Sequence, residues 1–195
     1  AQALALTAGA EGDIVFASGA TVGGVTPLTS LTTICNTLSI YAVTTTGAQS
    51  YTASTGTTPS TTLNGWLHLN TAGTIGFTGP VLLAAGGNEI HNVGAADTDD
   101  ITFSATSTIN GAQALALTTG TEGDIVFASG AIVGGVTPLT SLTTICNTLS
   151  IYAVTTTGAQ SYTASTGTAP STTLNGLDRK SVVYGKSVHC RVDLG

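Results

Sequence analysis

Four carboxylates near the middle of the chain have the residue type and spacing of a possible cation site: Glu89, Asp97, Asp99 and Asp100. Hard oxygen ligands on a turn are the groups that Ca²⁺ prefers. However, the stretch contains neither a complete EF-hand loop nor tandem GGxGxDx nonapeptides. A solvated turn that opens a strand is therefore favoured over calcium, and no metal-ligating residue is assigned.

Two histidines in the same region could take part in catalysis. His68 is flanked by leucines and His91 follows Ile90, so both should point to the outer side of a strand, away from their apolar neighbours. A hydrolase would need a base held against a nucleophile. β-Helix enzymes that act on acidic sugars also use Arg or Lys, and residues 1–177 contain neither. No catalytic or cofactor-binding residue is assigned, and we expect a protein that is not an enzyme.

These residues lie in a chain that is dominated by a near-identical duplication. Residues 1–66 return as residues 112–177 at a constant offset of 111. The five positions that differ are Ala8/Thr119, Ala10/Thr121, Thr21/Ile132, Thr58/Ala169 and Trp66/Leu177. Cys35 and Cys146 occupy one position of the two copies. One thiol per copy fits neither a zinc site nor a redox pair, so each is expected to be a small buried hydrophobe.

Trp66 is the only tryptophan of the chain. Its ring could stack on a sugar at the outer face, but a residue between a loop and a strand more often serves in simple packing. The sequence alone leaves both roles open.

The charge of the chain excludes several partners. Charged residues make up 7%, against about 25% in a typical soluble protein. Residues 1–177 carry eight acidic residues and no Lys or Arg. Such a body cannot neutralise phosphates, so nucleic acid and anionic lipid heads are excluded as partners. No run approaches the ~20 apolar residues of a membrane-spanning helix, so membrane insertion by this segment is not expected.

The last eighteen residues differ sharply in composition, since residues 178–195 hold all four basic residues. They begin with Asp-Arg-Lys-Ser, which GATCGGAAGAGC encodes, the opening of a common sequencing-library adapter. We interpret this tail as translated adapter read-through in an assembled metagenomic read, which predicts a Leu177 codon ending in A. The alternative is a disordered basic tail that contacts an acidic partner. In either case the tail does not enter the fold prediction.

A short Ile-x-Phe figure marks strands that repeat along the chain. It contains every phenylalanine and begins at Ile14, Ile75, Ile101 and Ile125. Ile and Phe two residues apart point to the same face of a strand. The uneven spacings between these isoleucines, and a period of 111 that divides into five near 22, suit coils of a β-solenoid. We predict about eight such coils over residues 1–177, with residues 67–111 as intervening coils.

Tandem immunoglobulin-like β-sandwiches of about 100 residues are the alternative architecture, because they would also accommodate the long period. A sandwich has no reason to repeat one strand figure at coil-like spacing. Helical periodicity is absent, and β-branched residues with Gly and Pro punctuation favour strands throughout. The prediction is therefore an all-β parallel β-helix. Residue 1 already lies inside the duplication, so we expect the chain to be a fragment of a longer protein.

Three stretches carry a resemblance: VTTTGAQSYTASTGTTPSTTLNG, GVTPLTSLTTICNTLSI and DDITFSATSTINGAQALALTTG. They resemble the filamentous-haemagglutinin-like, β-strand-repeat surface proteins of Gram-negative bacteria, over essentially all of residues 1–177. The resemblance implies a right-handed parallel β-helix, export to the cell surface or medium, and service as an adhesin or stalk without catalytic residues. Cys35, Cys146 and the Asp97–Asp100 cluster depart from that pattern.

The partners implied are a glycan or protein on a host or bacterial surface, together with neighbouring coils of the parent chain. Two other functions remain open at this point. One is a glycan-active β-helix enzyme, which would need a groove with converging carboxylates and a basic residue. The other is a calcium-stabilised repeat module, which a melting scan with and without chelator would test.

Overall fold

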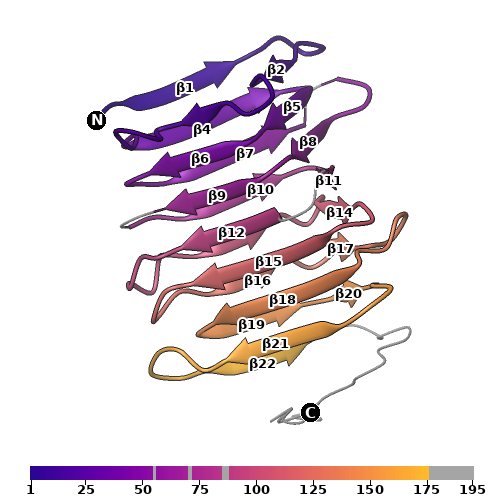
Figure 1. The fold of residues 1–195 in the computed structure, drawn as a ribbon. Coiled ribbons are helices and arrows are strands. Elements are labelled where there is room, and N and C mark those ends of the chain that lie inside the picture. The colour runs from indigo at the N-terminus through magenta and orange to yellow at the C-terminus, as the bar shows by residue number, and fades with distance from the viewer. Residues whose placement is uncertain (55, 70–71, 85–87, 176–195) are drawn as a thin grey trace.

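The computed structural model describes residues 1–54, 56–69, 72–84 and 88–175. Within these ranges every regular element is a β-strand and every strand pairing is parallel (Figure 1). No helix among the described residues has the length and apolar character needed to cross a bilayer. The predicted all-β parallel solenoid is confirmed. The tandem-sandwich alternative is wrong, because it would require antiparallel sheets. The tail at 178–195 lies outside the described residues.

Each turn of the chain adds one strand to each of three sheets, called A, B and C below. Sheet A contains β1 (Ala3–Thr7), β4 (Ser30–Cys35), β7 (Gln49–Ala53), β10 (Ile75–Thr78), β13 (Ile101–Phe103), β16 (Ile125–Phe127), β19 (Thr148–Ile151) and β22 (Ser171–Leu174). Sheet B contains β2 (Ile14–Val15), β5 (Thr37–Ile40), β8 (Ser60–Leu63), β11 (Val81–Leu83), β14 (Thr108–Asn110), β17 (Ile132–Val133) and β20 (Ala153–Val154). Sheet C contains β3 (Thr21–Val22), β6 (Ala42–Thr45), β9 (Trp66–Leu69), β12 (Asn88–Asn92), β15 (Ala114–Thr119), β18 (Ser141–Cys146) and β21 (Gln160–Ala164).

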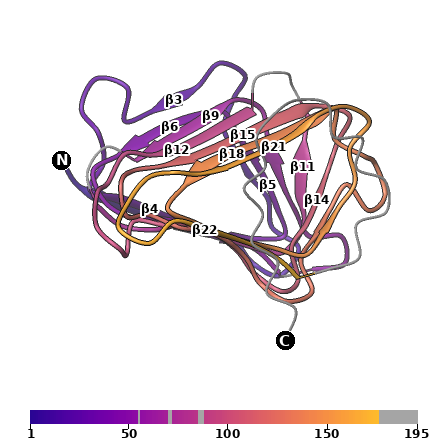
Figure 2. The ribbon, with the colours of Figure 1, turned by 90° about the horizontal axis from the view of Figure 1, so that it is seen from below.

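The three sheets enclose one interior, as the view along the axis shows (Figure 2). In that view the chain runs counterclockwise from sheet A through B to C while it approaches the viewer, so the solenoid is right-handed. This is the hand that parallel crossovers adopt almost without exception.

The core forms where strand residues alternate between the interior and the outer surface. Leu31, Leu38 and Val43, one from each sheet of the same turn, are all 1% exposed or less. In sheet A the pairing register places Ile75, Ile101 and Ile125 above one another. Beside them runs a stack of aromatic rings with centroids 4.7–5.1 Å apart, made by Tyr51, Phe77, Phe103 and Phe127. Three of the four predicted Ile-x-Phe figures therefore stack as coils of one ladder.

The coils are longer and less uniform than the sequence predicted. Seven turns lead from Ala3 to Ser171, and the average turn has about 24 residues, more than predicted. Single turns vary widely. The turn from Leu4 to Leu31 is half as long again as the following turn from Leu31 to Gln49. The second copy repeats this long turn and this short turn between Leu115 and Gln160. Coil length therefore follows the local sequence.

The two copies of the duplication occupy different sheets. The first strand of the first copy is β1 in sheet A, whereas its counterpart β15 lies in sheet C. The first copy supplies eight strands and the intervening residues supply six, so one full period spans fourteen strands, or four and two-thirds turns. The predicted period of five whole coils is wrong, because fourteen strands are not a multiple of three. The second copy is consequently turned by one sheet around the axis.

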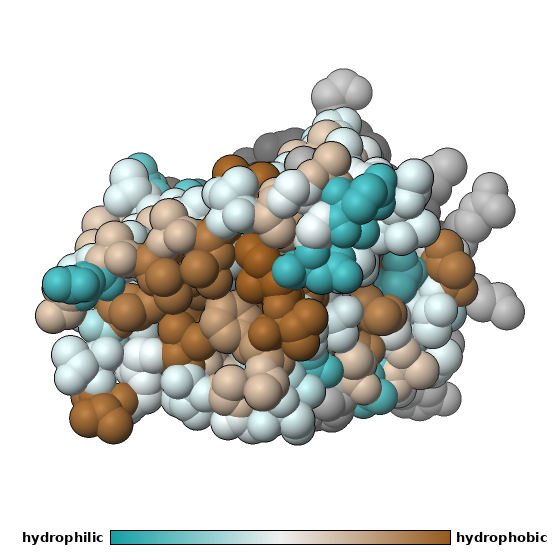
Figure 3. Space-filling model, turned by 90° about the horizontal axis from the view of Figure 1, so that it is seen from above, coloured by the Kyte–Doolittle hydropathy of each residue, from teal (hydrophilic) through white to brown (hydrophobic). Residues whose placement is uncertain are grey.

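Equivalent side chains of the two copies differ in burial when one of them lies in a terminal turn. In the second copy Leu115, Leu117, Ile125 and Phe127 are at most 2% exposed. Their counterparts in the first turn, Leu4, Leu6, Ile14 and Phe16, are only partly buried. The view onto the N-terminal end shows the resulting apolar area in the middle of that face (Figure 3). The residues are the same, so the difference comes from their place in the stack: no other described turn covers β1–β3 on that side.

The other end shows the same contrast. Leu174 on β22 is 52% exposed, whereas its counterpart Leu63 on β8 is fully buried. Tyr162 is likewise less buried than Tyr51. Among the described residues, both terminal turns thus carry core-type side chains that an internal turn would cover.

Candidate functional site

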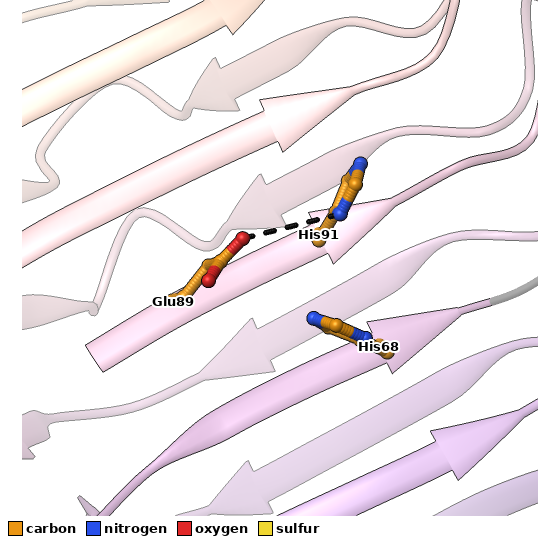
Figure 4. Close-up of side chains that lie close together, drawn as sticks. All are labelled: His68, Glu89 and His91. Atoms are coloured by element: carbon orange, nitrogen blue, oxygen red, sulfur yellow. Dashed lines mark ion pairs between the residues drawn. The ribbon is translucent and has the colours of Figure 1, made fainter. Parts of the chain in front are cut away.

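A cluster of two histidines, a glutamate and a tryptophan lies on the outer face of sheet C. The strands β9 and β12 are adjacent, and their register pairs Trp66 with Glu89 and His68 with His91. The residues between them point inward, since Leu67 and Ile90 are 0% and 1% exposed. Strand alternation therefore turns all four side chains outward, as predicted for both histidines. Figure 4 shows His68 on β9 beside the Glu89–His91 pair on β12.

The side chains of this cluster are close enough to act together. The ring centroids of Trp66 and His68 are 4.5 Å apart, and those of His68 and His91 are 5.4 Å apart with their planes nearly perpendicular. His91 Nδ1 lies 3.9 Å from Glu89 Oε1. One ring nitrogen of each histidine and one Glu89 oxygen all lie within 4.8 Å of one another. In the part of the chain that the structure describes, no other group of three such ligands is this compact.

His68 is the least solvated member of the cluster. Burial, and next the nearby His91, lowers the pKa of His68, while Glu89 acts in the opposite direction. Its Nε2 atom is closed off from water and has no hydrogen-bond partner. A polar atom shut off from water without a partner costs free energy. Burial therefore favours the neutral form of the His68 imidazole, whose Nε2 atom is unsatisfied, next to two more exposed polar side chains.

In the turn that was considered for calcium, Asp99 and Asp100 accept hydrogen bonds from the backbone. Asp99 is 1% exposed, and its two oxygens accept hydrogen bonds from Gly73 N and Ala96 N, both at 2.7 Å. Asp97 is exposed. Glu89, which the sequence grouped with these aspartates, lies beside His91 on sheet C. The structure thus does not bring the four carboxylates together as one ligand set.

A related series of aspartates links successive coils. Asp13, Asp100 and Asp124 each accept a hydrogen bond from a backbone N–H one turn further along, at Thr37, Asp124 and Thr148 respectively. Burial is the main cause that raises the pKa of Asp100, opposed by this bond from Asp124. These carboxylates satisfy turn N–H groups that the parallel ladder leaves unpaired, which is a structural use of the charge.

The cysteines are buried in the core and are not paired with each other. Cys35 on β4 and Cys146 on β18 are both fully buried and free, and they lie in different sheets. Burial raises the pKa of both thiols, that of Cys146 to about 12. Their prediction as small buried hydrophobes is confirmed.

Trp66 is 36% exposed and packs against His68. It packs against the histidine cluster at the surface, which agrees with the packing role, and the sugar-stacking role stays a hypothesis. Its counterpart Leu177 lies outside the described residues.

Sequence reasoning did not bring His68, His91 and Glu89 together, although one signal was present. The segments WLHL and EIHN align if each apolar residue that precedes a histidine is placed at the same coil position. That alignment places Leu67 one turn before Ile90, which is the register observed. A search at one fixed coil length would not have found this register, because turn length is not constant. The turn from Leu4 to Leu31 is half as long again as the turn from Leu31 to Gln49.

Comparisons with known proteins give no match: no protein-family model, no curated protein and no solved structure is similar to this chain.

Proposed function

We propose that this chain is a segment of a longer β-solenoid, exported to a bacterial cell surface or medium, that serves as an adhesin or stalk without catalysis. The observation that supports this most directly is the contrast between identical core positions. Leu117 is fully buried inside the stack, while Leu6 at the same repeat position is left partly exposed at the first turn. Another coil above β1–β3 would bury that apolar face, so the neighbouring coils of a parent chain are the partners proposed for both ends.

The outer surface suits contact through loops and hydroxyl groups. Outward strand positions are mostly Thr and Ser, and the described residues carry no Lys or Arg. The loop residue Val25 is 101% exposed, and its repeat counterpart Val136 is 86% exposed. Because the copies are turned by one sheet, the first loop joins sheets C and A and the second joins sheets B and C. We propose these two loops as contact elements for a surface glycan or protein.

The solenoid part of the proposal is tested by adding one more period. Residues 67–177 would be appended after Leu177 in place of the tail, and the particle length would be measured by small-angle X-ray scattering. Four and two-thirds further turns at ~4.8 Å each should lengthen the rod by about 22 Å. Nearest-neighbour stacking should also raise the unfolding temperature. Two separate compact bodies in the scattering curve would contradict a continuous solenoid.

The adhesin part needs a binding measurement. The labelled chain would be applied to glycan arrays and to host and bacterial cells, beside a Val25→Ser/Val136→Ser variant and a control with Val15→Ser. Val15 is 70% exposed on the strand β2 and lies outside these loops. Binding that only the loop variant loses supports loop-mediated adhesion. A chain that binds nothing in these assays argues against adhesion and leaves the stalk role.

A further inference from the structure

We propose that His68, Glu89 and His91 form a binding site for a divalent transition-metal ion of the Zn²⁺, Cu²⁺ and Ni²⁺ class on the outer face of sheet C. This inference is independent of the adhesin proposal, since it rests on one side-chain cluster and not on the ends of the solenoid. It also differs from the calcium turn considered from the sequence, because it shares only Glu89 with that group and takes two imidazoles in place of the aspartates.

The ligand geometry is close to what such an ion requires. The candidate ligand atoms lie within 4.8 Å of one another, and His91 Nδ1 to Glu89 Oε1 is 3.9 Å. Four-coordinate zinc with bonds of about 2.0–2.2 Å places neighbouring ligand atoms roughly 3.3 Å apart. The ligand atoms therefore need to approach one another by up to about 1.5 Å. Glu89 and His91 can make that adjustment by small rotations, since their side chains are 48% and 33% exposed.

The backbone beneath the site is rigid. Both strands are held by parallel pairing on each side, β9 between β6 and β12, and β12 between β9 and β15. Adjacent strands lie about 4.8 Å apart, and outward positions two residues apart on one strand lie about 6.7 Å apart. His68 and His91 face each other across adjacent strands at the first spacing. Glu89 and His91 are separated along β12 by the second spacing. The sheet thus presets the positions from which the three side chains converge.

The donor set selects the class of metal. Two imidazoles and one carboxylate suit Zn²⁺, Cu²⁺ and Ni²⁺, whereas Ca²⁺ and Mg²⁺ prefer an all-oxygen set. Three protein ligands leave a further coordination position for water or for an oxygen of a bound partner.

His68 is prepared for this role by its surroundings. Metal binding requires a neutral imidazole, and burial, which lowers the pKa of His68, already favours the neutral ring. Its Nε2 atom lacks a hydrogen-bond partner and is closed to solvent.

Trp66 supplies the readout for a test. It is the only tryptophan, and its ring centroid lies 4.5 Å from that of His68. Cu²⁺ quenches indole fluorescence at short range, whereas Zn²⁺ does not. The full chain would carry His189→Ala and Cys190→Ser, because these tail residues could themselves bind metal. We expect saturable quenching by one equivalent of Cu²⁺, reversal by EDTA and competition by Zn²⁺.

Substitutions then locate the site. His68→Gln and His91→Gln should each weaken Cu²⁺ binding by at least ~10-fold, the lower end of what the loss of even an outer-shell partner costs. Glu89→Gln should also weaken Cu²⁺ binding. Thr118→Gln is the matched control, since Thr118 pairs with His91 on the outer face of the next strand. The Cu²⁺ affinity of this variant should equal that of the parent chain. Wild-type affinity in both histidine variants would overturn the proposal.

A second measurement avoids any folding defect of the variants. The unsubstituted chain would be treated with diethyl pyrocarbonate with and without Zn²⁺, and carbethoxylation of each histidine would be read by mass spectrometry. We expect Zn²⁺ to lower modification of His91 by at least about tenfold and to leave the non-histidine products unchanged. Equal modification of His91 with and without saturating Zn²⁺ would refute the site.

Discussion

Phe16 and Phe127 occupy the same position of a duplicated sequence, yet they pack in different environments. Phe127 lies in sheet A and stacks on Phe103 with ring centroids 4.7 Å apart. Phe16 directly follows β2 of sheet B, where its N–H bonds to Ser39 O of the next turn. It is only partly buried. The pair shows that this solenoid accepts one sequence on more than one side of its cross-section.

The aromatic stack should contribute strongly to stability. Phe103 is sandwiched between Phe77 and Phe127 and is 1% exposed, so Phe103→Ala should lower the free energy of unfolding by about 3–5 kcal/mol. Phe16→Ala is the matched control. Its ring is partly exposed and has no ring partner in the stack, so it should cost markedly less. Urea unfolding followed by circular dichroism gives both values, and equal costs would show that the stack adds nothing.

Asp99 should matter more to folding than any other aspartate of its turn. Asp99→Ala removes the acceptors of the Gly73 and Ala96 N–H groups at a buried position, which should cost about 2–4 kcal/mol. Asp97→Ala changes an exposed side chain and should stay within about 0.5 kcal/mol. Melting curves of both variants, recorded with and without Ca²⁺, separate this structural role from cation binding. A melting temperature of the parent chain that rises with Ca²⁺ would favour the calcium alternative.

The end turn and an internal turn should respond differently to the same substitution. Leu117 is fully buried, so Leu117→Ala should cost about 2–5 kcal/mol of unfolding free energy. Leu6→Ala, at the same repeat position, should cost less because Leu6 is partly exposed at the first turn. Urea unfolding of the two variants gives the comparison.

The exposed ends should also promote association between molecules, because open strand edges and apolar faces pair readily. We expect residues 1–177 alone to associate on expression, and Leu4→Ser with Leu6→Ser to reduce that association in light scattering. A monodisperse monomer before substitution would contradict this expectation.

Acidification should weaken the fold through His68. Its pKa is lowered in the folded chain by burial, so the unfolded chain takes up a proton first as the pH falls through about 6.5. The free energy of unfolding contributed by this residue is therefore retained above about pH 6.5 and declines below it. His68→Gln should remove that part of the decline on acidification from slightly alkaline to mildly acidic pH, measured by urea unfolding at each pH. A pH dependence identical to that of the parent chain would count against it.

The sequence predicted much of the strand pattern, including which side chains face the interior. Outward orientation of His68 and His91 followed from the alternation of strand side chains, and burial of Cys35 and Cys146 followed from their type and isolation. The stacking of the Ile-x-Phe figures in sheet A followed from their recurrence. The same figure misplaced Phe16, because one strand motif serves sheet A in one copy and sheet B in the other. A motif reports the face of a strand and not the sheet to which the strand belongs.

The sequence by itself determined which residues form strands, which side chains point inward and how long each turn is. These properties are local, since the pleat has a period of two and turn residues set turn lengths, so both copies reproduce the same long turn followed by the same short one. Only the tertiary structure decided the sheet of each copy and the meeting of His68, Glu89 and His91. The sheet of a strand and its neighbours in adjacent turns both depend on how many strands precede it in the chain. Each turn uses three strands, and the fourteen strands of one period are not a multiple of three, so the second copy begins in a different sheet.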